Sequence, residues 1–228
     1  MDFLSDILSN PEIVFSIKLS FKVAFLATLF NLVFTTLLAY LFAYKNFPFK
    51  LVLESLINLP LVFPPTVTGF FLLLIFGKNS FIGSILEKLN FSIIFTVKGA
   101  ILASFLASFP IYFKTVKSAF EQVDKRYLLL CDLFGKSFFD KFFKVLLPLT
   151  KYSIFGAVLL SFARAIGEFG TTLVVAGNIP FKTTTISLEI YNLISQGDFN
   201  LALKLSYLVA IFCFLIAYTL NKFLYRKN

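Results

Sequence analysis

The sequence contains no histidine and no tryptophan, and only two of its 228 residues are cysteine. Without histidine, His-based catalysis is excluded and a zinc site is not expected. Cys131 and Cys213 lie far apart in the chain, so a disulfide framework is not expected either. Charged residues make up only 14% of the chain and hydrophobic residues 58%, which excludes a disordered chain and an ordinary soluble enzyme.

Five apolar stretches are long enough to cross a bilayer, for which a helix needs about 20 residues. The sequence therefore predicts an all-α, polytopic helical membrane protein with five or six transmembrane helices. A sixth element stays open, because residues 177–200 mix apolar, hydroxyl and turn residues, and residues 3–8 have the spacing of an interfacial helix. The five stretches cover approximately residues 23–44, 55–77, 93–113, 152 onward, and 201–220.

The second stretch contains a predicted break. Pro60, Pro64, Pro65 and Gly69 cannot all lie in one unbroken helix, because each proline removes a backbone hydrogen bond and clashes one turn back. A broken backbone at membrane depth persists only where it is buried in protein or lines a wet cavity. Pro64, Pro65, Thr66 and Gly69 are therefore candidates either for a packing kink or for the lining of a transport path.

The fourth stretch carries two charges, Arg164 and Glu168, four residues apart. Charges inside a membrane are costly and usually pair or face a cavity. One interpretation is a structural ion pair, and the other is a gate on a path that also includes Gly170 and Thr171. Tight anion binding by Arg164 is not expected, because Glu168 would neutralise its charge.

The distribution of basic residues predicts the topology. Arg164 and Lys204 aside, thirteen Lys and Arg residues fall on one side of the stretches and six on the other. Since cytoplasmic segments collect Lys and Arg, residues 114–151 and the C-terminus are expected in the cytoplasm and the N-terminus outside. The net charge of +9 thus reflects membrane topology rather than nucleic-acid binding. The smaller set is Lys18, Lys22, Lys78, Lys88, Lys98 and Lys182.

Residues 114–151 predict two short helices separated by a glycine turn at Gly135. Lys136, Asp140 and Lys144 are spaced to pair along one face of the second helix, which Pro148 is expected to end. Such a pair of helices either lies on the membrane surface or docks a cytoplasmic partner. The apolar face is formed by Phe138, Phe139, Phe142, Phe143 and Leu146.

This loop resembles that of the permease subunits of binding-protein-dependent ABC importers, which carries a Glu-Ala-Ala segment, a glycine and a Leu-Pro pair. Asp124 and Arg126 match the approach to that motif, and Gly135 matches its glycine. The resemblance implies that the loop couples the permease to an ATPase. Leu147 and Pro148 match the Leu-Pro pair, while Leu129, Leu130 and Cys131 stand at the Glu-Ala-Ala positions and so lack the glutamate.

Three further segments resemble the molybdate importer permeases: residues 59–69, residues 162–172, and the loop that follows them. The Ala-Gly-Asn-Ile-Pro sequence at 176–180 favours molybdate over sulfate. The resemblance implies one ABC-importer transmembrane domain over residues 1–228, a multi-pass protein of the bacterial inner membrane.

The partners implied by this resemblance are a second permease copy, two cytoplasmic ABC ATPase subunits and an extracytoplasmic molybdate-binding protein. ATP and Mg²⁺ would belong to the ATPase, because this chain has no Gly-x-x-x-x-Gly-Lys-Ser/Thr loop. The chain itself is expected to have no catalytic activity, cofactor or metal. A sulfate or tungstate permease remains an alternative, as does a secondary transporter or channel, although the inverted repeat expected of the latter class is not seen.

Overall fold

The computed structural model describes residues 3–225, and the regular structure in this range is entirely helical, as predicted. Arg226 and Lys227 of the basic tail lie outside the described residues. A short helix, α1 (Phe3–Ser9), precedes a continuous helix of 34 residues. That long helix consists of α2 (Pro11–Phe30), the π-helical segment η1 (Asn31–Thr35) and α3 (Thr36–Tyr44).

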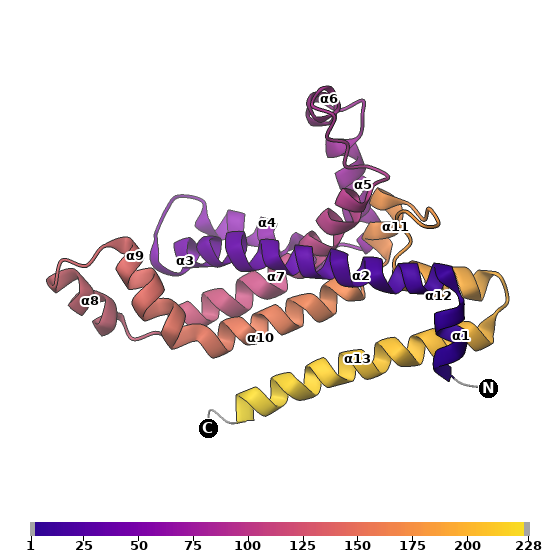
Figure 1. Ribbon diagram of the computed structural model, residues 1–228. Helices are drawn as coiled ribbons and strands as arrows, with labels where there is room; N and C mark the ends of the chain where they lie inside the picture. Colours follow the sequence, from indigo (N-terminus) through magenta and orange to yellow (C-terminus); the bar gives the residue numbers. More distant parts are fainter. Residues whose placement is uncertain (1–2, 226–228) are drawn as a thin grey trace.

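The second span is broken, as predicted. α4 (Lys50–Val62) and α5 (Pro65–Phe76) are bent by 119° relative to each other. The break is confined to Phe63 and Pro64, since Pro60 lies inside α4 and Gly69 inside α5. Pro65 starts α5, where its missing N–H would have had no partner in the helix. The short helix α6 (Phe81–Lys88) follows, and α5 and α6 form an arm that projects from the bundle (Figure 1).

The stretch expected to be a cytoplasmic loop is mostly helical. α7 (Val97–Glu121) extends well past residue 113, and α8 (Lys125–Leu133) follows it. The fourth long helix starts at Phe138 rather than near Tyr152, and runs for 29 residues to Ile166. It consists of α9 (Phe138–Asp140), the π-helical segment η2 (Lys141–Leu146) and α10 (Leu147–Ile166).

The expectation that Pro148 ends a helix was wrong. The preceding segment η2 changes the hydrogen-bond register, and the N–H of Leu147 donates to the carbonyl of Phe142 five residues back. A π-helical turn of this kind re-aims the carbonyls that a proline ring would otherwise strike. Pro148 therefore lies in the first turn of α10, and the helix continues through it.

Three helices complete the chain: α11 (Gly170–Ala176), α12 (Ile186–Ser195) and α13 (Phe199–Tyr225). Among the described residues, four helices are long and apolar enough to cross a membrane, and counting the bent pair α4–α5 as one broken span brings the number to five. Counted in this way, the spans match the five that the sequence predicted. α1 lies outside these spans, and so does the segment after Ala176, which consists of a loop followed by α12.

α7 forms the centre of the bundle, packing against α2, α3, α4, α10 and α11. Its buried side includes Gly99, Ala100, Ala103, Ser104 and Ala107. Small residues of this kind allow helix backbones to approach closely in a membrane. At one end of the bundle, larger side chains such as Tyr112, Phe113 and Phe120 fill a core with α3 and η2.

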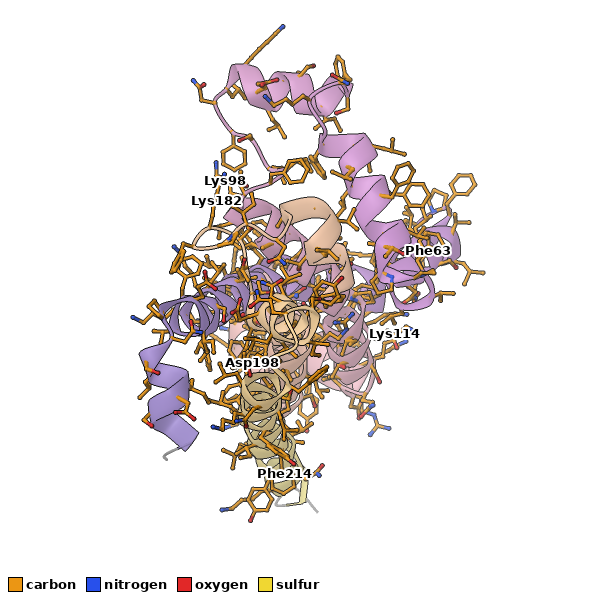
Figure 2. The ribbon with its side chains drawn as sticks, turned by 90° about the vertical axis from the view of Figure 1, so that its right-hand side faces the viewer. Phe63, Lys98, Lys114, Lys182, Asp198 and Phe214 are labelled. Atoms are coloured by element: carbon orange, nitrogen blue, oxygen red, sulfur yellow. The ribbon has the colours of Figure 1, made fainter. Side chains whose placement is uncertain are left out.

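The two ends of the bundle are distinct (Figure 1). α1 and α12 lie at one end, while α8 and the C-terminal end of α13 lie at the other. In the view along the bundle, α6 and Phe214 of α13 lie on opposite sides of the molecule (Figure 2). Only 11% of the most apolar segment of α13 is buried, so most of the surface of this helix faces outward.

Candidate functional site

The two interrupted regions of the chain meet each other. A Cβ atom built on Gly170, at the start of α11, would stand 2.7 Å from the Cβ of Pro65, at the start of α5. Further along the same two helices, a Cβ on Gly69 would stand 2.7 Å from the Cβ of Val174. Because neither glycine has room for a methyl group, α5 and α11 approach closely along their length.

A chain of polar contacts connects α10, α11 and α5 at this meeting point. Arg164 Nη1 donates to Glu168 Oε2 at 2.8 Å, and Glu168 Oε1 accepts the backbone N–H of Thr171 at 2.8 Å. The hydroxyl of Thr171 in turn donates to the carbonyl of Pro65 at 3.2 Å. Glu168 is therefore both an ion-pair partner and the cap of the first turn of α11.

Glu168 does not lie inside the fourth helix, as the sequence had suggested. α10 ends at Ile166, with Gly167 at its C-cap, and Glu168 lies in the turn before α11. The helix ends here because the backbone must turn for Glu168 to reach the N-terminus of α11. The ion pair is present, and it neutralises Arg164, whose side chain is 35% exposed while that of Glu168 is 1% exposed.

The structure brings most of the predicted path residues to this one place. Pro65, Gly69, Gly170 and Thr171 share the contact between α5 and α11, and Arg164 and Glu168 join it from α10. Pro64, Pro65 and Thr66 are exposed, whereas Gly69, Glu168 and Thr171 are buried. The exposed prolines thus border a buried polar contact.

The loop after α11 is held by its own side chains. The hydroxyl of Thr183 donates to the carbonyl of Gly177 at 3.1 Å and accepts the N–H of Ile179 at 3.0 Å. The hydroxyl of Thr184 donates to Asn178 Oδ1 at 2.8 Å, and the Asn178 amide also bonds to Asn192 of α12. The Ala-Gly-Asn-Ile-Pro sequence therefore has a structural role in shaping this loop.

At the other end of the bundle, α8 has defined ends. The side chain of Asp124 accepts the N–H of Arg126 at 2.9 Å and caps the start of the helix. Gly135 closes its C-terminus with φ of 61°. The N–H of Gly135 donates to the backbone carbonyl of Asp132, and the N–H of Lys136 donates to the backbone carbonyl of Cys131. This pair of bonds is the Schellman motif, which favours glycine at the left-handed position. The predicted helix–Gly–helix arrangement is confirmed.

The outer surface of this segment is apolar. Tyr127, Leu129, Leu130, Leu133 and Phe134 are all at least half exposed, and α8 buries no residue. Such a concentration of exposed apolar side chains marks an interaction surface. We call these five residues the α8 surface.

The predicted phenylalanine face is divided between two environments. Phe142 and Leu146 are buried, and the rings of Phe138 and Phe142 lie 5.2 and 5.6 Å from that of Tyr40 on α3. Phe139 and Phe143 are exposed instead. The expectation of a single face was wrong, because successive residues on a helix point about 100° apart. Phe142 and Leu146 therefore face the bundle, whereas Phe139 and Phe143 face outward.

The predicted pairing of Lys136, Asp140 and Lys144 along one helix face is also partly wrong. Asp140 pairs with Lys144 as expected, at 2.5 Å, but Lys136 lies in the turn before the helix, where Ser137 is the N-cap. Asp132 of α8 pairs instead with Lys141, which fastens α8 to the fourth helix. This cross-connection could not be read from spacing along one helix.

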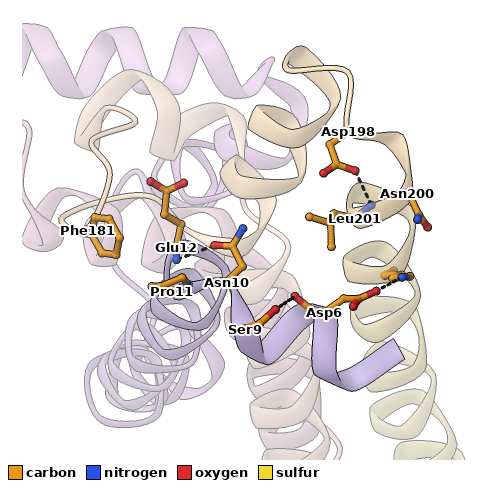
Figure 3. Close-up of a pocket in the computed structure, with 10 residues that line it drawn as sticks. Asp6, Ser9, Asn10, Pro11, Glu12, Phe181, Asp198, Asn200 and Leu201 are labelled. Atoms are coloured by element: carbon orange, nitrogen blue, oxygen red, sulfur yellow. Dashed lines mark hydrogen bonds and ion pairs between the residues drawn. The ribbon is translucent and has the colours of Figure 1, made fainter. Parts of the chain in front are cut away.

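A cavity of about 690 Å³ lies at the α1 end of the bundle and is unsuited to an anion (Figure 3). Three carboxylates line it, those of Asp6, Glu12 and Asp198, whereas the cation among its described lining residues, Lys204, is paired with Asp6. Asp198 also accepts the N–H of Leu201 at 3.1 Å, in the first turn of α13. The cavity is thus a junction of helix ends rather than a transport site.

Sequence reasoning missed a buried polar cluster in the bundle. The amide of Asn31 in η1 donates to Ser108 of α7 at 2.9 Å and to Ser161 of α10 at 3.1 Å. The hydroxyl of Thr35 donates to the side-chain oxygen Oδ1 of Asn31 at 2.9 Å. An asparagine in the middle of an uncharged span was the available signal, since buried amides in membranes bond to neighbouring helices.

Comparison with known proteins agrees with this architecture. Residues 20–227 match the model of the family described as binding-protein-dependent transport system inner membrane component. The chain is 39% identical over 189 residues to the molybdenum transport system permease protein ModB of Escherichia coli K12, covering 82% of each chain. It is 35% identical to the putative molybdenum transport system permease protein YvgM of Bacillus subtilis, covering 97% of this chain and 98% of that one.

A sulfate permease is also similar. The sulfate transport system permease protein CysT of Salmonella typhimurium is 31% identical over 216 residues, covering 95% of this chain and 78% of that protein. Among solved structures, a bacterial alginate ABC transporter in complex with its periplasmic protein superposes with a TM-score of 0.76 at 14% identity, covering 97% and 81% of the two chains. The family model, the relatives and the shared fold together show that the chain belongs to the binding-protein-dependent transport system inner membrane component family, as a permease subunit of an ABC transporter.

Proposed function

We propose that the chain is the membrane-spanning permease subunit of an ATP-driven molybdate importer. The observation that carries this proposal is the 39% identity to ModB, against 31% to CysT. The Ala-Gly-Asn-Ile-Pro sequence at 176–180 supports it, because this sequence resembles the molybdate permeases more than the sulfate permeases.

The proposed assembly contains two copies of this chain, two cytoplasmic ATPase subunits and an extracytoplasmic molybdate-binding protein. ATP and Mg²⁺ belong to the ATPase subunits. The α8 surface would dock on an ATPase subunit, as its exposed apolar side chains suit a protein partner. In this arrangement the N-terminus lies outside and the C-terminus in the cytoplasm, since α1 and α8 are at opposite ends (Figure 1).

The contact between α5 and α11 is the proposed gate region of the path. Arg164 is neutralised by Glu168, so this region offers a passing dianion a polar surface without a strong binding charge. Weak binding suits a path, because an anion held tightly would be released slowly. Pro64 and Thr66, which are exposed beside this contact, are the proposed lining.

The connection from ATPase to gate would run along the fourth helix. That helix is continuous from Phe138, next to the Gly135 turn, to Ile166, next to the Arg164–Glu168 pair. Movement of α8 on an ATPase would reach the helix through the Gly135 turn and the Asp132–Lys141 ion pair. Coupling therefore requires both the turn and the helix to keep their shape.

The test is anion uptake by cells that lack their own molybdate and sulfate permeases. The chain is expressed together with an ABC ATPase and an oxyanion-binding protein from the same organism, and uptake of radiolabelled molybdate and sulfate is measured at trace concentration. We expect saturable molybdate uptake that unlabelled tungstate inhibits, since the two dianions are nearly equal in size and charge.

Sulfate is the second candidate, favoured by the similarity to CysT over 95% of this chain. Sulfate uptake without molybdate uptake would replace the molybdate assignment. Cells that express only the ATPase and the binding protein are the control, and they should take up neither anion.

A further inference from the structure

A narrow apolar groove lies between the bundle and the α5–α6 arm. It has a volume of about 540 Å³, within the roughly 300–1,000 Å³ of ligand pockets. Its walls come from one face of α2 and η1 and from one face of α7, and its roof comes from the end of α5 and the segment before α7. The lining residues are Leu26, Phe30, Phe34, Phe76, Phe91, Ile93, Lys98, Ile101, Leu102 and Phe105.

Lys98 is the one polar residue among the described residues of this lining, and it lies at the end of the groove where α7 begins. Its ammonium group is 3.6 Å from the centre of the Phe91 ring, which holds it at the groove. In the described part of the chain no carboxylate lies within ion-pair distance of Lys98, whereas Lys78 nearby on the arm is paired with Glu87 at 2.6 Å. The groove therefore has an unneutralised cation at one end.

The groove follows the helix axes. On α7 its lining runs from Lys98 to Phe105, about 10 Å of helix, and on the first helix from Leu26 to Phe34, about 12 Å. Since Lys98 is the second residue of a membrane-spanning helix, the charged end lies at the edge of the bilayer and the apolar part extends into it. The helix dipole of α7 adds a partial positive charge at the same end.

We propose that this groove binds an anionic phospholipid, with its phosphate on Lys98 and one acyl chain between α2 and α7. The arrangement of one cation and nine apolar side chains matches an amphiphile with one charged end. A second copy of this chain is less well matched, because an apolar helix seated in the groove would leave the ammonium group of Lys98 without an anionic partner. The proposal does not depend on which anion the permease transports.

The absence of tryptophan from the chain makes a direct test available. Phe30→Trp places a single fluorophore in the groove wall, and Phe214→Trp places one on the outward surface of α13 (Figure 2). Each full-length variant is reconstituted into phosphatidylcholine vesicles that contain a small fraction of phosphatidylglycerol. Bromine on the acyl chains of either lipid quenches a tryptophan that this lipid contacts.

We expect brominated phosphatidylglycerol to quench the tryptophan of Phe30→Trp more strongly than brominated phosphatidylcholine does at equal mole fraction. The relative affinity for phosphatidylglycerol should be about fivefold higher, which is the effect of about one Lys at an anionic headgroup. The tryptophan of Phe214→Trp should show no such preference. Adding Lys98→Gln should remove the preference at position 30, Lys98→Arg should preserve it, and Lys182→Gln should leave it unchanged.

Two results would overturn the proposal. Equal quenching by both lipids at position 30 would show that the groove selects no anionic headgroup. Protection of position 30 from both brominated lipids, with normal quenching at 214, would show that a second copy of the chain covers the groove instead.

Discussion

Gly170 and Pro65 lie in direct contact across two interrupted spans, so a methyl group on Gly170 would stand 2.7 Å from the Pro65 Cβ. Both atoms belong to the first residue of a helix, α11 in one case and α5 in the other. The N-termini of α5 and α11 therefore meet at this contact. Adding a single carbon atom to Gly170 would push the two helices apart.

Gly170→Ala should therefore reduce transport. Overpacking of a tight contact costs about 1–3 kcal/mol, too little to prevent assembly of five spans but enough to separate α5 from α11. Anion uptake and membrane level are measured together, and uptake should fall at an unchanged level. Gly167→Ala is the matched control, because its nearest contact would be 3.7 Å away. Normal uptake by Gly170→Ala would show that this contact does not govern the path.

Gly135→Val should uncouple the permease from its ATPase. No atom of the described chain lies within 4 Å of a Cβ at Gly135, so the cost is backbone strain at φ of 61°, about 1–2 kcal/mol. We expect normal membrane level, reduced uptake and weaker ATPase co-purification. Gly135→Asn, which tolerates this backbone, should restore most of both.

Gly197→Val is the control for strain alone, since Gly197 has φ of 84° and equally open surroundings, but lies before α13. It should leave ATPase co-purification intact. If Gly135→Val retains the ATPase and transports normally, the turn is not part of the coupling.

Glu168→Gln should damage assembly or transport more than the double variant Glu168→Gln/Arg164→Gln. The single change leaves Arg164 without its partner, at a cost below the roughly 3–5 kcal/mol of a fully buried pair because Arg164 is 35% exposed. Removing both charges should recover part of the loss. Thermal stability in detergent and uptake are measured for both single variants and the double. Additive effects would mean that the two residues do not interact in the working protein.

Glu189→Gln should stabilise the protein at pH values above the ordinary pKa range of a glutamate. Glu189 lies in α12, which is not one of the candidate spans, and burial raises its pKa, with Glu12 adding a smaller repulsion. The folded chain thus holds this proton more tightly than the unfolded chain, and stability falls as pH rises from the ordinary range of a glutamate through the raised pKa. The melting temperature of Glu189→Gln should exceed that of the parent by a few degrees at neutral pH, with no difference in acid. Equal melting temperatures of the variant and the parent at every pH would show that folding does not raise the pKa of Glu189.

Lys182→Cys should react with an impermeant thiol reagent added outside intact cells, and Lys136→Cys should not. Both are made after Cys131 and Cys213 are replaced. The reason is the excess of basic residues near the α8 end of the bundle, which predicts that this end lies in the cytoplasm. The opposite labelling pattern would invert the topology.

Features that depend on local rules were predictable from the sequence. The bend at Pro64 and the glycine turn at Gly135 both follow from backbone restrictions on single residues. The end of a helix at Pro148 followed from the same reasoning and was wrong. A local rule does not include the π-helical register of η2, a segment whose Phe142 and Leu146 are buried against α3 and α7.

Contacts between distant segments could not be predicted in this way. The spacing of Arg164 and Glu168 indicated their ion pair, but nothing near Glu168 in the sequence indicates that the pair would extend through Thr171 to Pro65, 106 residues away. Asn31 gave a signal of polarity inside a span, without indicating that its partners would be Ser108 and Ser161. These partners follow from the order in which the spans pack.

The hydrogen bond from Asn31 to Ser161 has a mechanical consequence for the fourth helix. Ser161 is near one end of a helix that runs from Phe138 to Ile166, so the bond divides it into arms of about 35 Å and 8 Å. A tilt about this pivot would move the α8 end of the helix roughly four times as far as the end beside Arg164. In the proposed coupling, a large displacement at the α8 end of the fourth helix would thus become a smaller one where Gly170 meets Pro65.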